Sequence, residues 1–151
     1  MKAAKWWCPG VPAPKGSARA ITVGKGKNAR AVLVPSSSDA NRRAQDAWAG
    51  AVGWSGRAQF GSAPPMDGAV AVRVVFHMPA PKRLARLRPT VKPDIDKLLR
   101  STLDALTGIA WRDDAQIVSA EVVKEYAGKA GPGADIEVTE LPATPGEEQG
   151  Q

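Results

Sequence analysis

A group of five aspartates between Lys92 and Gln116 is the part of this sequence whose residue types and spacing could do chemistry. They are Asp94, Asp96, Asp104, Asp113 and Asp114. Carboxylates that are crowded together repel one another, so a fold that gathers several needs either shared protons or a bound cation. Their oxygens are ligands that suit Mg²⁺. The stretch therefore predicts a candidate site for a divalent metal.

The positions of these acids along the chain predict how they would meet. Asp94 and Asp96 stand where an extended segment enters a helix, and the irregular backbone at such a junction can bring their side chains together. Asp113 and Asp114 follow a turn that begins the next strand. We expect the chain to fold back and place one of them beside the first pair. Three carboxylates from two adjacent element ends would then bind one or two metal ions, with water and a phosphate completing the coordination.

Structural roles explain some of the same residues without chemistry. Asp96 could serve only as a helix N-cap, and Asp94 only as a first-turn acid that complements the helix dipole. Arg100 lies four residues after Asp96 and four before Asp104, so ion pairs on the helix surface account for it at least as well as catalysis does. Asp104 is better explained as structural. An Asp-Asp pair is common in turns.

The element that must position the first pair is an amphipathic helix. It is predicted to start between Pro93 and Asp96 and to run to about Thr107, where Gly108 supplies a stop. Its apolar positions recur with helical spacing, and they are Ile95, Leu98, Leu99, Thr102, Leu103 and Leu106. One face of this helix therefore packs on a sheet.

The other elements complete an α+β fold. Residues 9–32 indicate an early strand and a basic loop or hairpin, and a helix is predicted near residues 38–53 with Ser and Asp as N-cap candidates. Strands are predicted at 69–78, 116–127 and 134–141. The order, roughly β-β-α-β-α-β-β, gives a mixed or antiparallel β-sheet with two helices packed against it. We expect one domain over residues 1–141, and a disordered acidic tail over residues 142–151.

Composition excludes several classes of protein. No apolar run approaches the roughly 18 residues that a membrane span needs, and the first ten residues lack the apolar core of a signal peptide. One cysteine excludes an internal disulfide, and one histidine, His77, excludes a multi-histidine metal site. We expect a cytoplasmic protein. His77 and the tryptophans, which are Trp6, Trp7, Trp48, Trp54 and Trp111, are expected in core, rim or capping positions.

Charge is divided unevenly along the chain. Residues 1–92 carry 16 Lys and Arg against 3 Asp and Glu, whereas residues 93–151 carry 5 against 12. The segment 79–92 holds five of the basic residues, no acid and three prolines, which predicts an exposed loop. Such a surface favours a polyanionic partner, although charge alone does not separate DNA from RNA or anionic lipid.

The stretch "KPDIDKLLRSTLDALTGIAWRDDAQI" closely resembles the signature of the RusA family of Holliday-junction resolvases. "PGVPAPKGSAR" at residues 9–19 is similar to the basic N-terminal segment of that family, and the resemblance extends to about residue 140. It implies a small, homodimeric, Mg²⁺-dependent endodeoxyribonuclease that cuts four-way DNA junctions during recombination and repair. Symmetric sites in a two-fold dimer could cut two opposed strands of such a junction.

The resemblance also implies roles for individual residues. Asp94 and Asp96 match the paired catalytic, metal-binding aspartates of the family, and Asp114 matches the third, with Asp113 adjacent. Arg100 stands where the family usually has a functionally important lysine, and Lys97 where it usually has asparagine. Arg100 keeps a positive charge that could stabilise the transition state, and Lys97 could contact phosphate or lower metal affinity.

The basic residues supply candidate contacts to the DNA backbone, which position a branch without selecting its sequence. These candidates are Lys15, Arg19, Lys82, Arg83, Arg86, Arg88, Lys92 and Lys97. Two alternatives stay open. The protein could bind junctions without cutting them, if Lys97 and Arg100 have spoiled the metal site, or it could be a nuclease that acts on other branched DNA.

Overall fold

The computed structural model describes residues 2–15, 18–35, 38–83 and 85–144. Its main elements are β1 (Ala3–Pro9), β2 (Ala18–Val23), β3 (Arg30–Pro35), α1 (Asp39–Phe60), β4 (Val70–Met78), α2 (Ile95–Leu106), β5 (Ile117–Tyr126) and β6 (Gly133–Glu140). There are also two short 3₁₀ turns: η1 (Gly26–Asn28) lies between β2 and β3, and η2 (Asp114–Gln116) lies directly before β5. The predicted α+β class is confirmed, with one more strand before α1 than the predicted order has.

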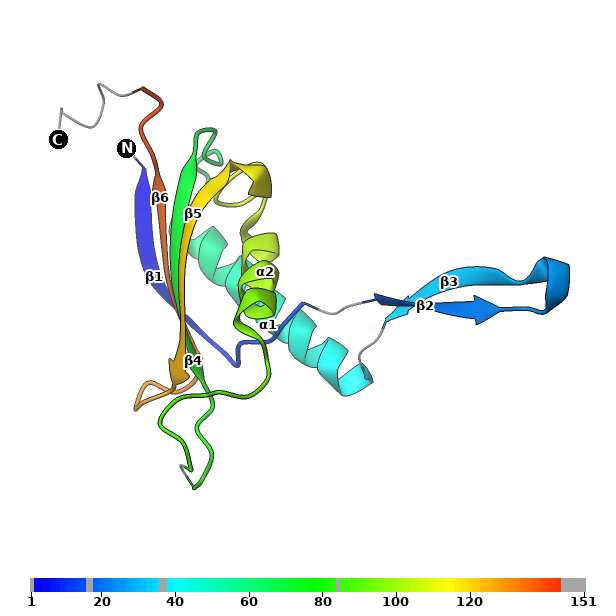
Figure 1. Ribbon diagram of the computed structural model, residues 1–151. Coiled ribbons are helices and arrows are strands. Elements are labelled where there is room, and N and C mark those ends of the chain that lie inside the picture. Colours follow the sequence, from blue (N-terminus) through cyan, green and yellow to red (C-terminus); the bar gives the residue numbers. More distant parts are fainter. Residues whose placement is uncertain (1, 16–17, 36–37, 84, 145–151) are drawn as a thin grey trace.

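A four-stranded sheet in the order β1-β6-β4-β5 forms one layer, and both helices lie on one of its faces (Figure 1). β4 pairs antiparallel with β6 and parallel with β5, so the sheet is mixed, as predicted. A parallel pair needs a crossover connection, which α2 provides here. The residue entering α2 therefore lies at the end of the sheet where β4 finishes, and the residues after α2 lie at the opposite end, where β5 begins.

The inner face of the sheet and the inner sides of both helices form the core. Along β4 the alternate residues from Val70 to Met78 are buried, as expected for a half-covered strand. The indole N–H of Trp48 donates to Thr102 Oγ1 at 3.1 Å, and the Thr102 hydroxyl donates to the carbonyl of Leu98 at 2.9 Å. This pairing satisfies the one fully buried hydroxyl of α2 inside the core.

Helix α1 begins where the sequence predicts and ends later. Ser38 is the N-cap, and its side chain accepts a hydrogen bond from the backbone N–H of Asn41. The predicted end near residue 53 was too early, because the helix continues to Phe60. Gly56 lies where α1 meets α2: a Cβ there would come within 2.7 Å of Leu106 Cδ2. Gly56 thus serves close packing rather than a helix stop.

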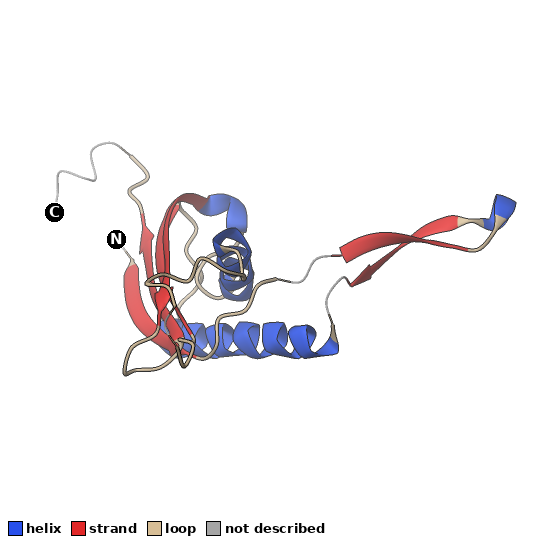
Figure 2. Ribbon diagram, turned by 60° about the horizontal axis from the view of Figure 1, so that its bottom comes forward, coloured by secondary structure: helices blue, strands red, loops and turns tan. Residues whose placement is uncertain are grey.

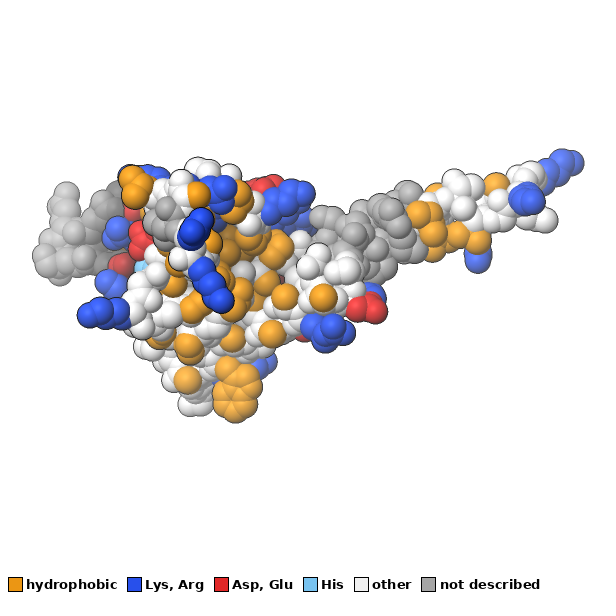
Figure 3. Space-filling view, turned by 90° about the horizontal axis from the view of Figure 1, so that it is seen from below, with side chains coloured by type: hydrophobic (Ala, Val, Ile, Leu, Met, Phe, Trp, Pro, Cys, Tyr) orange, Lys and Arg blue, Asp and Glu red, His pale blue; other side chains and the backbone are white. Residues whose placement is uncertain are grey.

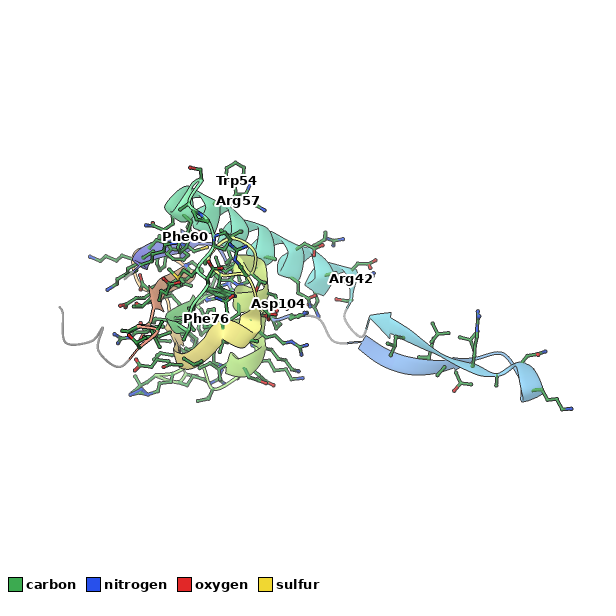
Figure 4. All side chains as sticks on the ribbon, turned by 90° about the horizontal axis from the view of Figure 1, so that it is seen from above. Arg42, Trp54, Arg57, Phe60, Phe76 and Asp104 are labelled. Carbon is green, nitrogen blue, oxygen red and sulfur yellow. The ribbon has the colours of Figure 1, made fainter. Side chains whose placement is uncertain are left out.

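The tryptophans occupy different environments. Trp6, Trp48 and Trp111 are buried, in agreement with prediction, and the indole N–H of Trp6 donates to Ser55 Oγ at 2.9 Å. Trp54 contradicts the expectation, since 77% of it is exposed and it points away from α1 into solvent (Figure 4). Its position on the outer side of α1 leaves no second layer to cover it.

Strands β2 and β3 form a separate two-stranded sheet that stands away from the body of the protein (Figures 1 and 2). They confirm the predicted basic hairpin, while strand β1 before them was not predicted. None of the helices in the described part of the chain has both the length and the apolar run that a membrane crossing needs. Most of the predicted tail, at residues 145–151, lies outside the described residues, so its disorder stays a prediction.

Candidate active site at the amino end of helix α2

The pair Asp94 and Asp96 stands at the amino end of α2. Asp94 is the N-cap residue, yet its side chain makes no capping hydrogen bond, and Asp96 lies in the first turn. This corrects the structural alternative in which Asp96 would be the cap. Both residues are exposed, and the Asp94 side chain retains 56% of its accessible surface. Their carboxylate oxygens therefore remain available to a ligand.

An open groove of about 1150 Å³ borders this pair. Its lining includes Arg88, Lys92, Asp94, Asp96, Val123 and Lys124. The groove thus brings two carboxylates together with three cations that come from the loop before α2 and from strand β5. Figure 3 shows the end of the molecule to which this loop belongs, with Lys and Arg side chains spread over it. The predicted exposed loop at residues 79–92 is confirmed for the residues that the structure describes.

Lys124 holds the entrance to α2 against the sheet. Its ammonium donates to the carbonyl of Val91 at 2.9 Å and to the carbonyl of Pro93 at 2.8 Å. The loop residues directly before Asp94 are therefore tied to β5. Sequence reasoning missed this lysine, although a signal was present: Lys124 alternates with Val122 and Tyr126 on the helix-facing side of a strand, where a charged residue needs a partner.

A second hollow of about 290 Å³ lies on the other side of Asp94. Asn41, Gln45, Lys92, Asp94 and Lys97 are among the residues that line it. Lys97 Nζ lies 4.0 Å from Asp94 Oδ2, at the outer limit of an ion pair. Asp94 thus separates two concave surfaces, and Lys97 is placed to meet an anion that approaches the pair from the side of α1.

Asp114 stands at the other end of α2. Its Oδ1 accepts hydrogen bonds from the hydroxyl of Thr107, the residue that caps α2, and from the indole N–H of Trp111 at 3.1 Å. Partial burial acts to raise the pKa of the Asp114 carboxyl. Hydrogen bonds with Thr107, Trp111 and Asp104, together with the charge of Lys15, outweigh it and lower that pKa below its ordinary value. Asp114 is therefore an oriented, ionised carboxylate.

The single chain does not bring the three predicted metal ligands together. A helix of 12 residues separates Asp94 from the Thr107 cap to which Asp114 bonds, and its length is about 18 Å at 1.5 Å per residue. Within the ranges that the structure describes, no group of three or more His, Cys, Asp or Glu side chains could hold one ion. The expected meeting of Asp114 with the pair is absent, because the crossover carries the two ends of α2 to opposite ends of the sheet.

Asp113, the acid adjacent to Asp114, has a local role. Its side chain caps η2 by accepting from the backbone N–H of Ala115 at 2.9 Å, within a capping box that Gln116 completes. Gln116 also donates to the carbonyls of Met66 and Gly68, which fixes the turn to the start of β4. The turn that carries Asp114 is thereby rigidly placed.

The remaining cations take several positions. Arg100 is exposed and forms no ion pair within the described ranges, so the expected helix-surface pairs with Asp96 and Asp104 are not seen. Asp104 instead pairs with Lys15, which supports its structural role. Lys82, Arg83 and Arg86 are exposed on the loop of residues 79–92, which we call the basic loop, together with Arg88 and Lys92. Arg19 belongs to β2, and its side chain lies outside what the structure describes.

His77 lies on the open face of the sheet, on the far side from the helices. Its Nε2 is 2.9 Å from Asp135 and its Nδ1 is 3.3 Å from Glu125, so the imidazole joins two neighbouring strands. The two carboxylates stand at different ring nitrogens and cannot share one ion with the ring. His77 is a rim residue, as predicted.

Comparison with known proteins identifies a similar protein and a matching family for this chain. It is 31% identical over 90 residues to the uncharacterized protein YqaN of Bacillus subtilis (strain 168). That match spans 52% of this chain and 62% of the relative, so the chain covers less than two thirds of the length of that protein. The model of the family described as endodeoxyribonuclease RusA matches residues 9–139. This range runs from the end of β1 through both helices to β6, includes the acidic pair, the basic loop and Asp114, and shows that the chain belongs to the RusA endodeoxyribonuclease family.

Proposed function

We propose that this protein is a Mg²⁺-dependent, structure-selective endodeoxyribonuclease that resolves Holliday junctions. The observation that carries the proposal is the pair Asp94 and Asp96, whose carboxylates open onto a groove with Arg88, Lys92 and Lys124 on its walls. Membership of an endodeoxyribonuclease family supports nuclease chemistry in general. The magnesium ion, the junction and the cytoplasmic setting are our proposal.

The donor set of the pair fits magnesium. Mg²⁺ keeps several waters and is commonly held by one or two carboxylates together with substrate phosphates. Asp94 and Asp96 offer two exposed carboxylates of that kind, and no capping hydrogen bond occupies the first. When bound, the ion would polarise the scissile phosphate, lower the pKa of an attacking water and neutralise the leaving oxygen.

The residues around the pair would bring in and orient the DNA backbone. Arg88 and Lys92 lie in the groove beside the carboxylates and are placed to contact phosphates on either side of the scissile one. Lys97 reaches the same region from the opposite hollow. Arg100 lies one turn further along α2 than Asp96 and has no ion-pair partner among the described residues, so its guanidinium could stabilise negative charge on the transition state.

We retain Asp114 as the proposed third acidic residue, which the family pattern implies. Its separation from the pair means that the pair alone is expected to hold an ion in the isolated chain. We also propose a two-fold homodimer, because two symmetric sites suit two opposed strands of a junction.

One observation favours an alternative in which the protein binds junctions without cutting them. Lys97 Nζ stands 4.0 Å from Asp94 and could compete with a metal ion for that carboxylate. Nicking of a synthetic four-way junction in the presence of Mg²⁺, compared with linear duplex, replication forks and flaps, distinguishes this alternative and identifies the preferred branched substrate.

The direct test compares Asp94→Asn with wild type and with Asp46→Asn, a matched substitution at an exposed position on α1. Asp94→Asn should bind the four-way junction with unchanged affinity and lose Mg²⁺-dependent nicking, because the ion loses a charged ligand while the cations that hold DNA remain. Asp46→Asn should cut normally. Normal cutting by Asp94→Asn, or cutting by wild type without divalent metal, would contradict the proposal.

A further inference from the structure

The hairpin formed by β2 and β3 has no role in the site described above. We call residues 18–35 the basic arm. Its strands pair antiparallel from Ala18 opposite Pro35 to Val23 opposite Arg30, and the arm extends away from the sheet and helices (Figures 1, 2 and 4). It therefore presents both faces of a narrow two-stranded ribbon to whatever the protein binds.

The far end of the basic arm concentrates positive charge. Lys25, Lys27 and Arg30 are exposed around the turn, and the sequence from residue 18 to residue 35 contains no Asp or Glu. Figure 3 shows Lys and Arg side chains at the end of the arm that is farthest from the body. With no acid within the arm, its cations can be neutralised only by groups outside it.

The backbone of the turn is built to expose those side chains. Gly24 has a φ of 92°, and a Cβ at that residue would come within 2.7 Å of the carbonyl oxygen of Asn28. Gly26 has a φ of 60° and begins η1. Both residues adopt the left-handed region that glycine tolerates. The chain reverses tightly, and the lysines between and after these glycines lie on the outside of the turn.

The shaft of the arm carries apolar side chains that face solvent. Ile21 pairs with Val32 across the ribbon, and the exposed fractions of Ile21, Val23 and Leu33 are 37%, 40% and 75%. An isolated two-stranded hairpin is only marginally stable in water, so such a ribbon gains stability by lying against another surface. The major groove of DNA admits a two-stranded β-ribbon. Methyl-bearing side chains on the ribbon can contact bases and sugars there while cations reach phosphates.

The acidic surface of a second copy is a weaker match for the arm. On the sheet's open face, Glu121 lies 3.5 Å from Arg73, and Glu125 and Asp135 contact the His77 ring, so these acids already have partners. DNA offers an unbroken row of phosphates instead. Charge complementarity therefore selects DNA as the occupant.

We propose that the basic arm binds a duplex arm of branched DNA, with its ribbon in a groove and with Lys25, Lys27 and Arg30 on phosphates. This inference rests on the proposed function and extends it, since it adds a second DNA contact separate from the acidic pair. The basic loop and acidic pair would hold the strand to be cut, while the basic arm holds the duplex beside it.

The first test removes the charges of the turn. Lys25→Gln, Lys27→Gln and Arg30→Gln are combined in one variant, and Lys2→Gln, Lys5→Gln and Lys129→Gln, at exposed positions on the body, form a control with the same net charge. Binding of a synthetic four-way junction is followed by fluorescence anisotropy over a range of salt, without divalent metal. Because log K falls as log salt rises, the slope of this plot is negative. Loss of three phosphate contacts should make it shallower by about 2–3, and the control should keep the wild-type slope.

The second test locates the turn on the DNA. Cys8 is fully buried, so an Asn28→Cys substitution gives one accessible thiol for an iron–EDTA probe that cleaves nearby DNA. The expected result is a discrete set of cuts on one duplex arm of the junction. A probe at Lys129→Cys, on the exposed connection between β5 and β6, should give no such set.

The outcomes separate this proposal from the proposed function. If wild type nicks the junction while the triple variant binds with the wild-type slope and the Asn28 probe gives no discrete cuts, the arm proposal is overturned and the function stands. If wild type neither binds nor cuts branched DNA, both are overturned. A triple variant that changes sedimentation without changing DNA binding would assign the arm to a second copy and overturn the proposal.

Discussion

Asp94 and Asp114 lie at opposite ends of α2, where the same type of side chain has two different environments. Asp94 caps α2 by its backbone position alone, and its carboxylate at the groove makes no capping hydrogen bond and only a long ion pair with Lys97. Asp114 is oriented by Thr107 and Trp111, and its pKa is lowered. A loosely held carboxylate can rearrange around an incoming ion, whereas an oriented one presents a fixed charge. Under the proposed function, Asp94 is therefore the better suited of the two to exchange ligands.

The hydroxyl of Thr107 can be tested as a determinant of the pKa of Asp114. Thr107→Val removes one hydrogen bond to the carboxylate, so the pKa of Asp114 should rise toward or above its ordinary value, and Thr107→Ser should preserve the lowered pKa. Carboxyl chemical shifts followed by NMR against pH measure this directly. An unchanged pKa in Thr107→Val would show that Trp111 and Lys15 suffice.

The same shift has a consequence for acid stability. A carboxyl with a lowered folded-state pKa stabilises the native protein above its unfolded pKa, and this stabilisation is lost as pH falls through the folded value. When the pH falls below 3.8, the ordinary pKa of Asp, Thr107→Val should therefore lose less stability than wild type loses.

At the scale of the elements, strand β1 depends on the close approach of its residues Trp7 and Cys8 to Gly133 of β6. A Cβ at Gly133 of β6 would meet the Trp7 ring at 2.4 Å and the carbonyl oxygen of Cys8 at 2.5 Å. Glycine at this position lets β1 pair with β6 through its last residue, Pro9 opposite Gly133. The edge strand and the segment after it, which leads along α2 to Lys15, depend on that pairing.

Gly133→Ala should lower the free energy of unfolding by about 1–3 kcal/mol, the usual cost of forcing an extra methyl into a packed site. Gly128→Ala is the control, because nothing lies within 4 Å of the Cβ it would add. Urea denaturation of both variants measures the difference. Equal stability of the two would mean that Trp7 and the β1 backbone move aside at little cost.

At the scale of the whole molecule, Arg88 and Lys92 from the basic first part of the chain lie beside an acidic pair that belongs to the later part. The loop between β4 and α2 and the basic arm carry cations on separate parts of the structure. A branched polyanion can engage both at once, whereas a linear duplex that lies in the groove need not reach the arm. Selectivity for branches would then come from geometry rather than from base contacts.

Replacing Arg83, Arg86 and Arg88 with glutamine should weaken junction binding. Because phosphate contacts are lost, the negative slope of log K against log salt should become shallower by about 2–3. Asp94→Asn should leave the slope of the same assay unchanged, because the carboxylate does not contact phosphate without metal. If the loop variant keeps the wild-type slope, the loop lies outside the DNA-binding surface.

Much of the local structure could be predicted, because the relevant signals are local. Pro93, Gly108 and the spacing of Leu98, Leu103 and Leu106 define α2 almost to the residue. Alternating apolar residues define β4, β5 and β6 to within one or two positions. The placement of Asp94 and Asp96 at the start of α2, and of the exposed loop before it, follows from residue type and spacing, while the roles of these residues stay predictions.

The placement of Asp114 could not be predicted in the same way. Whether a strand after a helix runs beside the helix entrance or returns to the far end depends on strand order, which is set by packing between distant segments. β5 pairs parallel to β4, and so Asp114 begins at the end opposite Asp94. Strand β1 was missed because it pairs with β6 from the other end of the chain, and its own short alternation is weak.

The two hydrogen bonds from Lys124 to the carbonyls of Val91 and Pro93 hold the residues directly before the acidic pair, so changes earlier in the loop need not move that pair. The acidic pair is thereby held in place against β5, whereas the described residues of the span from Pro79 to Arg88 are exposed. Under the proposed function, insertions, deletions or new side chains in that span would retarget the protein to differently shaped nucleic acids without displacing Asp94 and Asp96. Specificity would then change in the loop while the proposed reaction centre stays in place.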